Sequence, residues 1–223
     1  DDGDSLTACE RFDRCTFLFA KIVGLGKLTA RESGVEPAKV VEILQLIFDR
    51  FDSLADLFCV QKVRKTVYES YMLAAGLPDR DVLKGEAARA HAVTSLACAM
   101  ISIMDIINVE AHKLGVPATI TLGLQIGIHS GSAIAGIIGH KRYQYDLCGD
   151  DVNVAARMMG GSAPYCVNMS DVTYQLVKED FDAIDRGERF VKGKGQMRQF
   201  FITGGASGKA AQSHHESYHH ESK

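Results

Sequence analysis

The chain has 223 residues, of which 46% are hydrophobic and 24% charged, so it is long enough to bury a large core without disulfides. A net charge of −3 argues against a large nucleic-acid surface. With no run of about 18 apolar residues and no basic N-terminal stretch before an apolar core, we expect neither a membrane span nor a signal peptide.

The first half of the chain predicts a strand, a long helix and a strand hairpin. Residues 16–25 form an apolar run broken by one lysine, which is typical of a strand buried on both faces. Residues 37–58 place apolar side chains three and four apart, behind a proline suited to a first helical turn. Residues 63–78 predict two strands with a turn near 68–70, and Leu77-Pro78 closes this hairpin.

The second half predicts another helix, further strands and a terminal hairpin. A long helix is expected over about 87–114, where glycine and proline end it. Residues 120–138 alternate, and His-Ser-Gly-Ser at 129–132 predicts a turn between two strands. Short helices are expected at 150–159 and after Ser170, followed by a hairpin with a glycine-rich turn at 187–203.

This order predicts an α+β protein with a ferredoxin-like βαββαβ core and a C-terminal helix and β-hairpin appendix. We expect a lead-in at 1–15, one domain at 16–203 and a disordered, polar, His-rich tail at 204–223. The tail histidines favour a solvated linker over a metal-binding segment. The six cysteines show no metal-type spacing and are predicted to be free thiols in a reducing compartment.

Three short patterns are candidates for ligand binding. Asn153 and Arg157 share one face of a predicted helix, where an amide and a guanidinium suit ribose and phosphate oxygens. Lys192 lies in the turn VKGKG, whose glycines allow close approach of an anion. Lys65, on a predicted strand, needs an acceptor such as a purine nitrogen. Each pattern also has an ordinary interpretation: a solvated helix face, a basic turn or a salt bridge.

Taken together, the chain resembles the catalytic domain of class III adenylyl and guanylyl cyclases over residues 16–203. Five stretches carry the resemblance in the family's order: LFAKIVGL, VRKTVYESYMLAAGLP, LGLQIGIHSGSAIAGIIG, YQYDLCGDDVNVAARM and RGERFVKGKGQMRQFFIT. The resemblance implies the nucleotide cyclase fold and closure of a nucleoside triphosphate into a 3′,5′-cyclic monophosphate with release of pyrophosphate. It also implies a head-to-tail dimer with two Mg²⁺ or Mn²⁺ ions in a site between the domains.

Carried over by position, the resemblance implies that Lys65 and Asp146 read the purine. Adenine-specific members have lysine and aspartate there, whereas guanylyl cyclases tend to have glutamate and cysteine, so the pair predicts ATP. Asn153 would orient the ribose and Arg157 would stabilise charge on the α-phosphate. Lys192 would bind the terminal phosphates.

The metal positions depart from the family pattern. Lys21 stands in FAKIVGL where the pattern FADIVGF has an aspartate, and lysine cannot ligate magnesium. Glu69 replaces the second aspartate, behind Tyr68 in place of a glycine. The chain therefore resembles the second cytosolic domain of heterodimeric adenylyl cyclases. We predict an adenylate cyclase half-site that is inactive or nearly so as a homodimer, with the ions held mainly by a partner domain that supplies the aspartates.

Three alternatives stay open: a catalytically dead regulatory pseudocyclase, half of a guanylate cyclase, and a ferredoxin-like RNA-binding module, which the charge disfavours. The resemblance implies a cytoplasmic domain of a larger protein, in a family that includes membrane-anchored members. We expect no nucleic-acid partner and no membrane contact by this fragment itself. The regulator, the location of the partner domain and the state of the isolated chain stay open.

Overall fold

The computed structural model describes residues 9–66, 70–78, 82–138 and 144–205. The elements in chain order are β1 (Cys9–Val23), α1 (Leu25–Thr29), the 3₁₀ helix η1 (Arg31–Ser33), α2 (Pro37–Leu57), β2 (Gln61–Thr66), β3 (Ser70–Ala75), α3 (Glu86–Ser102), α4 (Met104–Lys113), β4 (Gly123–Ile138), β5 (Gln144–Cys148), α5 (Asp150–Gly160), β6 (Cys166–Ser170), α6 (Asp171–Val177), β7 (Phe181–Val191) and β8 (Gly195–Gly205).

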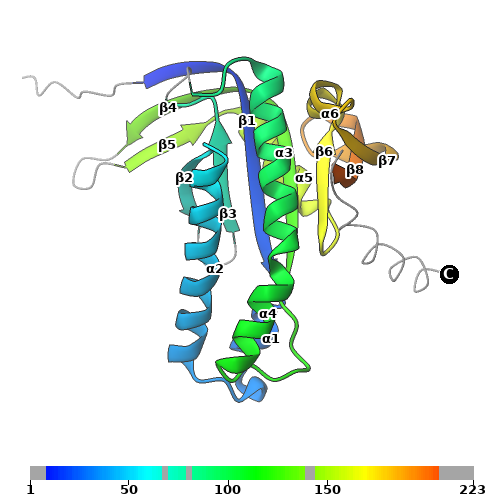
Figure 1. The fold of residues 1–223 in the computed structure, drawn as a ribbon. Helices are drawn as coiled ribbons and strands as arrows, with labels where there is room; N and C mark the ends of the chain where they lie inside the picture. The colour runs from blue at the N-terminus through cyan, green and yellow to red at the C-terminus, as the bar shows by residue number, and fades with distance from the viewer. Residues whose placement is uncertain (1–8, 67–69, 79–81, 139–143, 206–223) are drawn as a thin grey trace, which may run out of the picture.

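All the described strands belong to one sheet (Figure 1). Its order is β2-β3-β1-β4-β6-β8-β7, and β5 pairs with β4. The strands β4-β1-β3-β2, with α2 and the helices α3 and α4 as connections, form the predicted ferredoxin-like βαββαβ core. The α+β fold class is confirmed.

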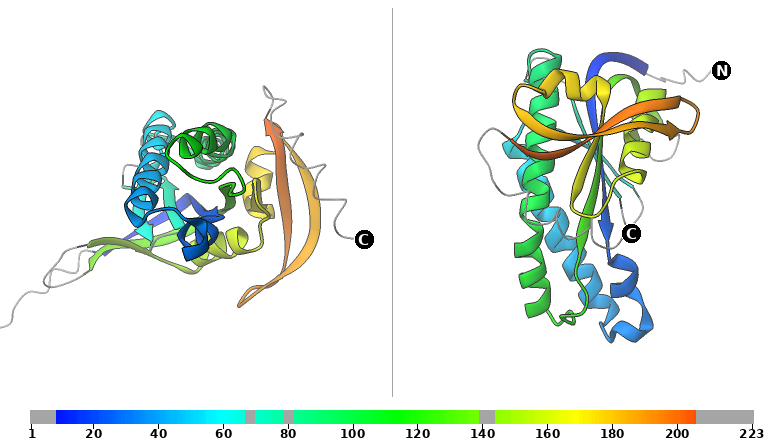
Figure 2. Two further views of the ribbon diagram at one scale, coloured as in Figure 1. Left: turned by 90° about the horizontal axis from the view of Figure 1, so that it is seen from below. Right: turned by 90° about the vertical axis from the view of Figure 1, so that its right-hand side faces the viewer.

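Helices cover both faces of this sheet, as the strand pattern requires. Leu18, Ala20 and Ile22 of β1 pack in the larger core with α2, α3 and α4. Phe17 faces the opposite way into a second core that includes side chains of α5. Figure 2 shows α2 and α3 together on one side of the central strands. The prediction that β1 is buried on both faces is confirmed, because alternate side chains enter two different cores.

An ionic contact fastens the β2–β3 hairpin to α2. Asp52 of α2 accepts hydrogen bonds from Lys62 Nζ at 2.6 and 2.8 Å and from the hydroxyl of Tyr71. Tyr71 is buried, and this burial raises the pKa of its phenol. The contact holds β2, the strand that carries Lys65, against the helix layer.

Several predicted boundaries differ from the structure. β1 begins at Cys9 rather than at residue 16, and the helix expected over 87–114 consists of α3 and α4, with Ile103 between them. Ser102 Oγ donates to the Cys98 carbonyl at 2.9 Å, a side-chain bond of the kind that bends helices. By length and composition the helical segment 86–113 could cross a membrane, but 50% of its most apolar window is buried within the fold.

The turn predicted at 129–132 is wrong, because β4 runs without a break through these residues. His129 and Ser130 are buried polar side chains that bond to other elements: Ser130 Oγ lies 2.9 Å from Thr16 Oγ1. Gly131 is required by close packing, since a Cβ there would lie 2.3 Å from Asp151 Oδ2. Glycine in this strand therefore marks an approaching helix and not a change of direction.

The remaining predictions divide between confirmed elements and residues that the structure does not describe. The helices after Gly149 and Ser170, the β7–β8 hairpin and the free state of the cysteines are confirmed. The short strands β5 and β6 were not predicted. Residues 67–69 of the predicted first hairpin turn and 206–223 of the predicted tail lie outside the described residues. The prediction that the disordered tail begins at 204 is wrong, because β8 continues to Gly205 and pairs there with β7.

Candidate active site

Helix α5 positions two of the predicted site residues, Asn153 and Arg157. It packs on β4 so closely that a Cβ on Gly127 would lie 1.9 Å from the backbone nitrogen of Met159. Only glycine allows this approach. The Asn153 side chain is exposed and Arg157 is half-buried. The predicted helix therefore presents an amide and a guanidinium one turn apart.

Arg157 also contacts the turn that carries Lys192. Its Nη1 donates to the Lys192 carbonyl oxygen. The next residue, Gly193, has a φ of 76°, and a Cβ there would lie 3.3 Å from Arg157 Nη1. A side chain at Gly193 would be strained and would crowd the guanidinium. The structure thus brings Arg157 and the Lys192 backbone together and leaves the Lys192 side chain exposed.

A basic groove of about 790 Å³ opens between the end of α5 and the β7–β8 hairpin. Glu188 is the acidic residue in its lining, alongside four cationic residues: Arg157, Arg186, Arg189 and Lys192. Arg186 has a structural role, because its Nη1 donates to the Gly161 carbonyl at 2.8 Å and to Asn168 Oδ1 at 3.0 Å. The excess of positive charge suits an anionic ligand.

The two predicted purine-reading residues lie on strands that contact each other, β2 and β5. Asp146 of β5 is half-buried, and its Oδ1 accepts the backbone N–H of Leu147 at 3.0 Å. Lys65 pairs in register with Tyr71 through the backbone of β2. Its side chain lies outside the described part of the chain, so the pairing of the two side chains around a base stays a prediction.

The residue at the family's first metal position does not fit a metal ion. Lys21 lies half-buried on β1, in register with Ser70 and Gln125. An ammonium offers no ligand oxygen and repels a cation. Glu69 lies outside the described residues, and no group of three His, Cys, Asp or Glu residues that could hold a metal occurs among those that are described.

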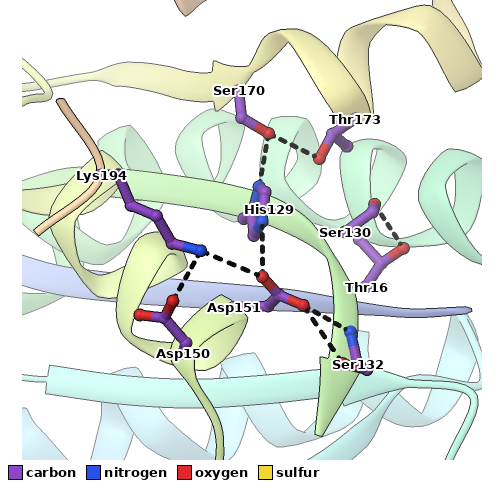
Figure 3. A network of polar contacts seen from close by, with 9 residues as sticks. All are labelled: Thr16, His129, Ser130, Ser132, Asp150, Asp151, Ser170, Thr173 and Lys194. Carbon is purple, nitrogen blue, oxygen red and sulfur yellow. Dashed lines mark hydrogen bonds and ion pairs between the residues drawn. The ribbon is translucent and has the colours of Figure 1, made fainter. Parts of the chain in front are cut away.

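A network of polar side chains lies beside α5, and the sequence did not predict it (Figure 3). His129 Nδ1 lies 2.7 Å from Ser170 Oγ, and its Nε2 faces Asp151 Oδ1 at 3.6 Å. Asp151 Oδ2 accepts the backbone N–H of Ser132 at 2.8 Å. Lys194 Nζ lies 3.8 Å from Asp151 Oδ1. The network therefore links β6, β4, α5 and the β7–β8 turn.

Lys194 also forms an ion pair with Asp150, with 2.6 Å between Nζ and Oδ2. This hydrogen bond raises the pKa of Lys194 and lowers that of Asp150. The sequence shows two consecutive acidic residues at the start of this helix. Acidic residues are common there because they interact favourably with the helix dipole, so they do not by themselves indicate a network. Nothing in the local sequence indicates that the second lysine of VKGKG reaches them.

Burial lowers the pKa of His129, despite the neighbouring Asp151, and Lys194 lowers it further. The unfolded chain binds a proton at this histidine near pH 6.5, while the folded protein resists it. The free energy of unfolding should therefore fall as the pH drops below about 6.5, by up to roughly 1.4 kcal/mol per pH unit. Urea unfolding of the wild type and of His129→Gln across pH 5.5–8 tests this. An equal slope in both proteins would contradict it.

The family model for the adenylate and guanylate cyclase catalytic domain matches residues 7–204. The chain belongs to this cyclase family. The cyclase domain is 33% identical over 195 residues to an adenylate cyclase of Mycobacterium tuberculosis and 36% identical over 203 residues to guanylate cyclase 32E of Drosophila melanogaster. These matches cover 87% and 90% of the chain, but 40% and 16% of the relatives.

Solved structures support the same fold. The adenylyl cyclase CyaB from P. aeruginosa superposes with a TM-score of 0.80 at 23% identity, covering 91% of the cyclase domain and 98% of that chain. The catalytic core of a rhodopsin-guanylyl cyclase with converted specificity, in complex with ATPαS, gives 0.75 at 26% identity, covering 87% and 97%. The nucleotide cyclase fold implied by the sequence motifs is confirmed.

Proposed function

We propose that this cyclase domain is the substrate-recognising half of an adenylate cyclase. In this function it joins a partner domain head to tail and forms 3′,5′-cyclic AMP and pyrophosphate from ATP. The domain supplies the purine contacts and the residues that stabilise the transition state. The partner supplies the metal-binding aspartates. The observation that supports assigning the metal site to the partner is Lys21 on β1, a cation at the family's first metal position.

The described residues support a role in phosphoryl chemistry. The ribose 3′ oxygen attacks the α-phosphate and pyrophosphate leaves, so negative charge develops on the phosphate oxygens. Arg157, which has five N–H donors, uses Nη1 for the Lys192 carbonyl and retains others for a phosphate. Asn153, exposed one turn earlier, would hold the ribose. Lys192 would bind the terminal phosphates from the turn.

The choice of ATP rests on Lys65 and Asp146. A lysine donates to the unprotonated N1 of adenine, and an aspartate accepts from the 6-amino group. Guanine presents the reverse polarity at both atoms, so it leaves both side chains unsatisfied. The family relatives include adenylate and guanylate cyclases, so the pair of residues, and not the family, supports ATP.

A complementation assay tests the proposal. The cyclase domain is mixed with a family domain that carries both metal aspartates but has its own asparagine and arginine of the α5 motif replaced by alanine. We expect cyclic AMP from the mixture with Mg²⁺ or Mn²⁺, and little or none from either domain alone. Each subunit then lacks what the other provides. Cyclic AMP formed by the isolated domain, at a rate that the partner does not change, would refute the half-site.

A regulatory pseudocyclase is the second candidate, and Lys21 is the observation that favours it. The two candidates differ in the mixture. A pseudocyclase forms no cyclic AMP with any partner. A half-site forms cyclic AMP with a suitable partner and loses that activity when Asn153 or Arg157 is replaced. Comparing ATP with GTP in the same mixture distinguishes the adenylate from the guanylate half.

A further inference from the structure

Asp151 contacts two elements that flank α5. On one side, its Oδ2 accepts the backbone N–H of Ser132 at 2.8 Å and its hydroxyl at 3.3 Å, which ties the first turn of α5 to β4. On the other side, its Oδ1 lies 3.8 Å from Lys194 Nζ in the β7–β8 turn. The same oxygen faces the buried His129 (Figure 3). One carboxylate therefore spans the sheet, the helix and the turn.

The packing around Asp151 leaves its side chain little freedom. A Cβ on Gly131 would lie 2.3–2.4 Å from its carboxylate Oδ2 and Cγ. His129, which packs beneath it, is anchored in turn by Ser170, whose Oγ lies 3.2 Å from Thr173 Oγ1. A side chain fixed this way sets the position of whatever it binds. Here the carboxylate faces Lys194 at 3.8 Å, in the turn that also carries Lys192, and the neighbouring Asp150 makes the shorter contact of 2.6 Å.

The two lysines of VKGKG have different surroundings. Lys194 lies between Asp150 and Asp151, so its charge is largely compensated. Lys192 is exposed and lines the basic groove together with Arg157. Two contacts hold the turn against α5: Lys194 at the first turn of the helix and the Arg157 bond to the Lys192 carbonyl further along. We call these two contacts the α5–turn clamp.

We propose that Asp151 and Lys194 are positioning residues: through the α5–turn clamp they set the distance of Lys192 from Asn153 and Arg157. This inference rests on the proposed function. It assigns the second lysine of VKGKG to the placement of the turn, and the first to the nucleotide. Asp150, at 2.6 Å, and Asp151, at 3.8 Å, both attract the Lys194 ammonium, and Asp151 is the one that is also hydrogen-bonded to β4. The clamp therefore requires the negative charge of Asp151 and not only its size.

The kinetic test uses a double-mutant cycle in the complemented enzyme. Asp151→Asn keeps the shape of the side chain and an oxygen for Ser132 but removes the charge that attracts Lys194. We expect it to lower kcat roughly tenfold, with a change in KM below about threefold, because charge on the leaving pyrophosphate grows in the transition state. Lys194→Met should have at least as large an effect, because it also removes the 2.6 Å pair with Asp150, and the double variant should be no worse than Lys194→Met alone.

The matched control is Asp171→Asn. Asp171 is also an acidic residue in a first helical turn, but its Oδ1 accepts an exposed hydrogen bond from Gln175 Nε2 within helix α6. This variant should keep kcat unchanged. Additive losses in the Asp151 and Lys194 variants, or a loss of thermal stability with an unchanged kcat per folded molecule, would overturn the positioning role.

Hydrogen exchange on the isolated domain gives a readout that does not depend on the partner. Asp151→Asn and Lys194→Met should each speed the exchange of backbone amides at 191–195 by several-fold, whereas Asp171→Asn should not. Unchanged exchange in both variants would refute the clamp. If the wild-type mixture forms no cyclic AMP but the Asp151→Asn and Lys194→Met domains exchange faster, the proposed function is refuted and the clamp is not. The two failures are therefore distinguishable.

Discussion

Replacing Arg157 by alanine should lower the turnover of the complemented enzyme by about 10²–10³-fold. The guanidinium is the half-buried cation of α5, and its position is set by the Lys192 carbonyl. Alanine removes both the charge that meets the developing phosphate charge and the second contact of the α5–turn clamp. Single-turnover formation of cyclic AMP, at saturating partner and nucleotide, measures the effect on the chemical step.

Arg198→Ala is the control for this change. Arg198 lies on β8 of the same hairpin and forms an exposed ion pair with Asp185. Exposed pairs contribute at most about 1 kcal/mol to stability, so this variant should turn over like the wild type. Arg157→Lys should fall between, since lysine keeps the charge but loses the forked geometry. A kcat for Arg157→Ala within about threefold of the wild type would exclude a role in the transition state.

Local periodicity and motif order were sufficient to predict much of the fold and the positions of several candidate site residues. Helix α2 begins at Pro37, as the proline and the spacing of apolar side chains predict. Helix α5 carries Asn153 and Arg157 on consecutive turns because a four-residue spacing nearly matches the helical period. The departure at Lys21 is also visible in a single motif. These features depend on neighbours in the chain, which a sequence displays directly.

Features that depend on distant packing were not predictable in this way. His-Ser-Gly-Ser at 129–132 has the composition of a turn, yet it is strand because α5 requires glycine there and other elements bond to the buried His129 and Ser130. Likewise, the two lysines of VKGKG are equivalent by local pattern. Only the approach of Asp150 and Asp151 from another element distinguishes Lys194 from Lys192.

Exchanging Lys65 and Asp146, the proposed purine-reading pair, should reverse the nucleotide preference. With Lys65→Glu and Asp146→Cys together, the site offers an acceptor to the protonated N1 of guanine and removes the charge that repels its 6-oxo group. A polar site that loses its matching partner discriminates strongly, so the ratio of kcat/KM for ATP to that for GTP should shift by at least about 10² in favour of GTP. Measuring both nucleotides in the same complemented mixture gives the ratio directly.

Cys148→Ser separates base reading from local disturbance of β5. Cys148 is an exposed residue at the end of the strand that carries Asp146, so its replacement should leave the ratio unchanged. Each single exchange should lower ATP turnover without creating a good GTP enzyme, because one of the two polar atoms of either base then lacks a partner. A double variant that still prefers ATP would show that the partner domain, and not this pair, selects the base.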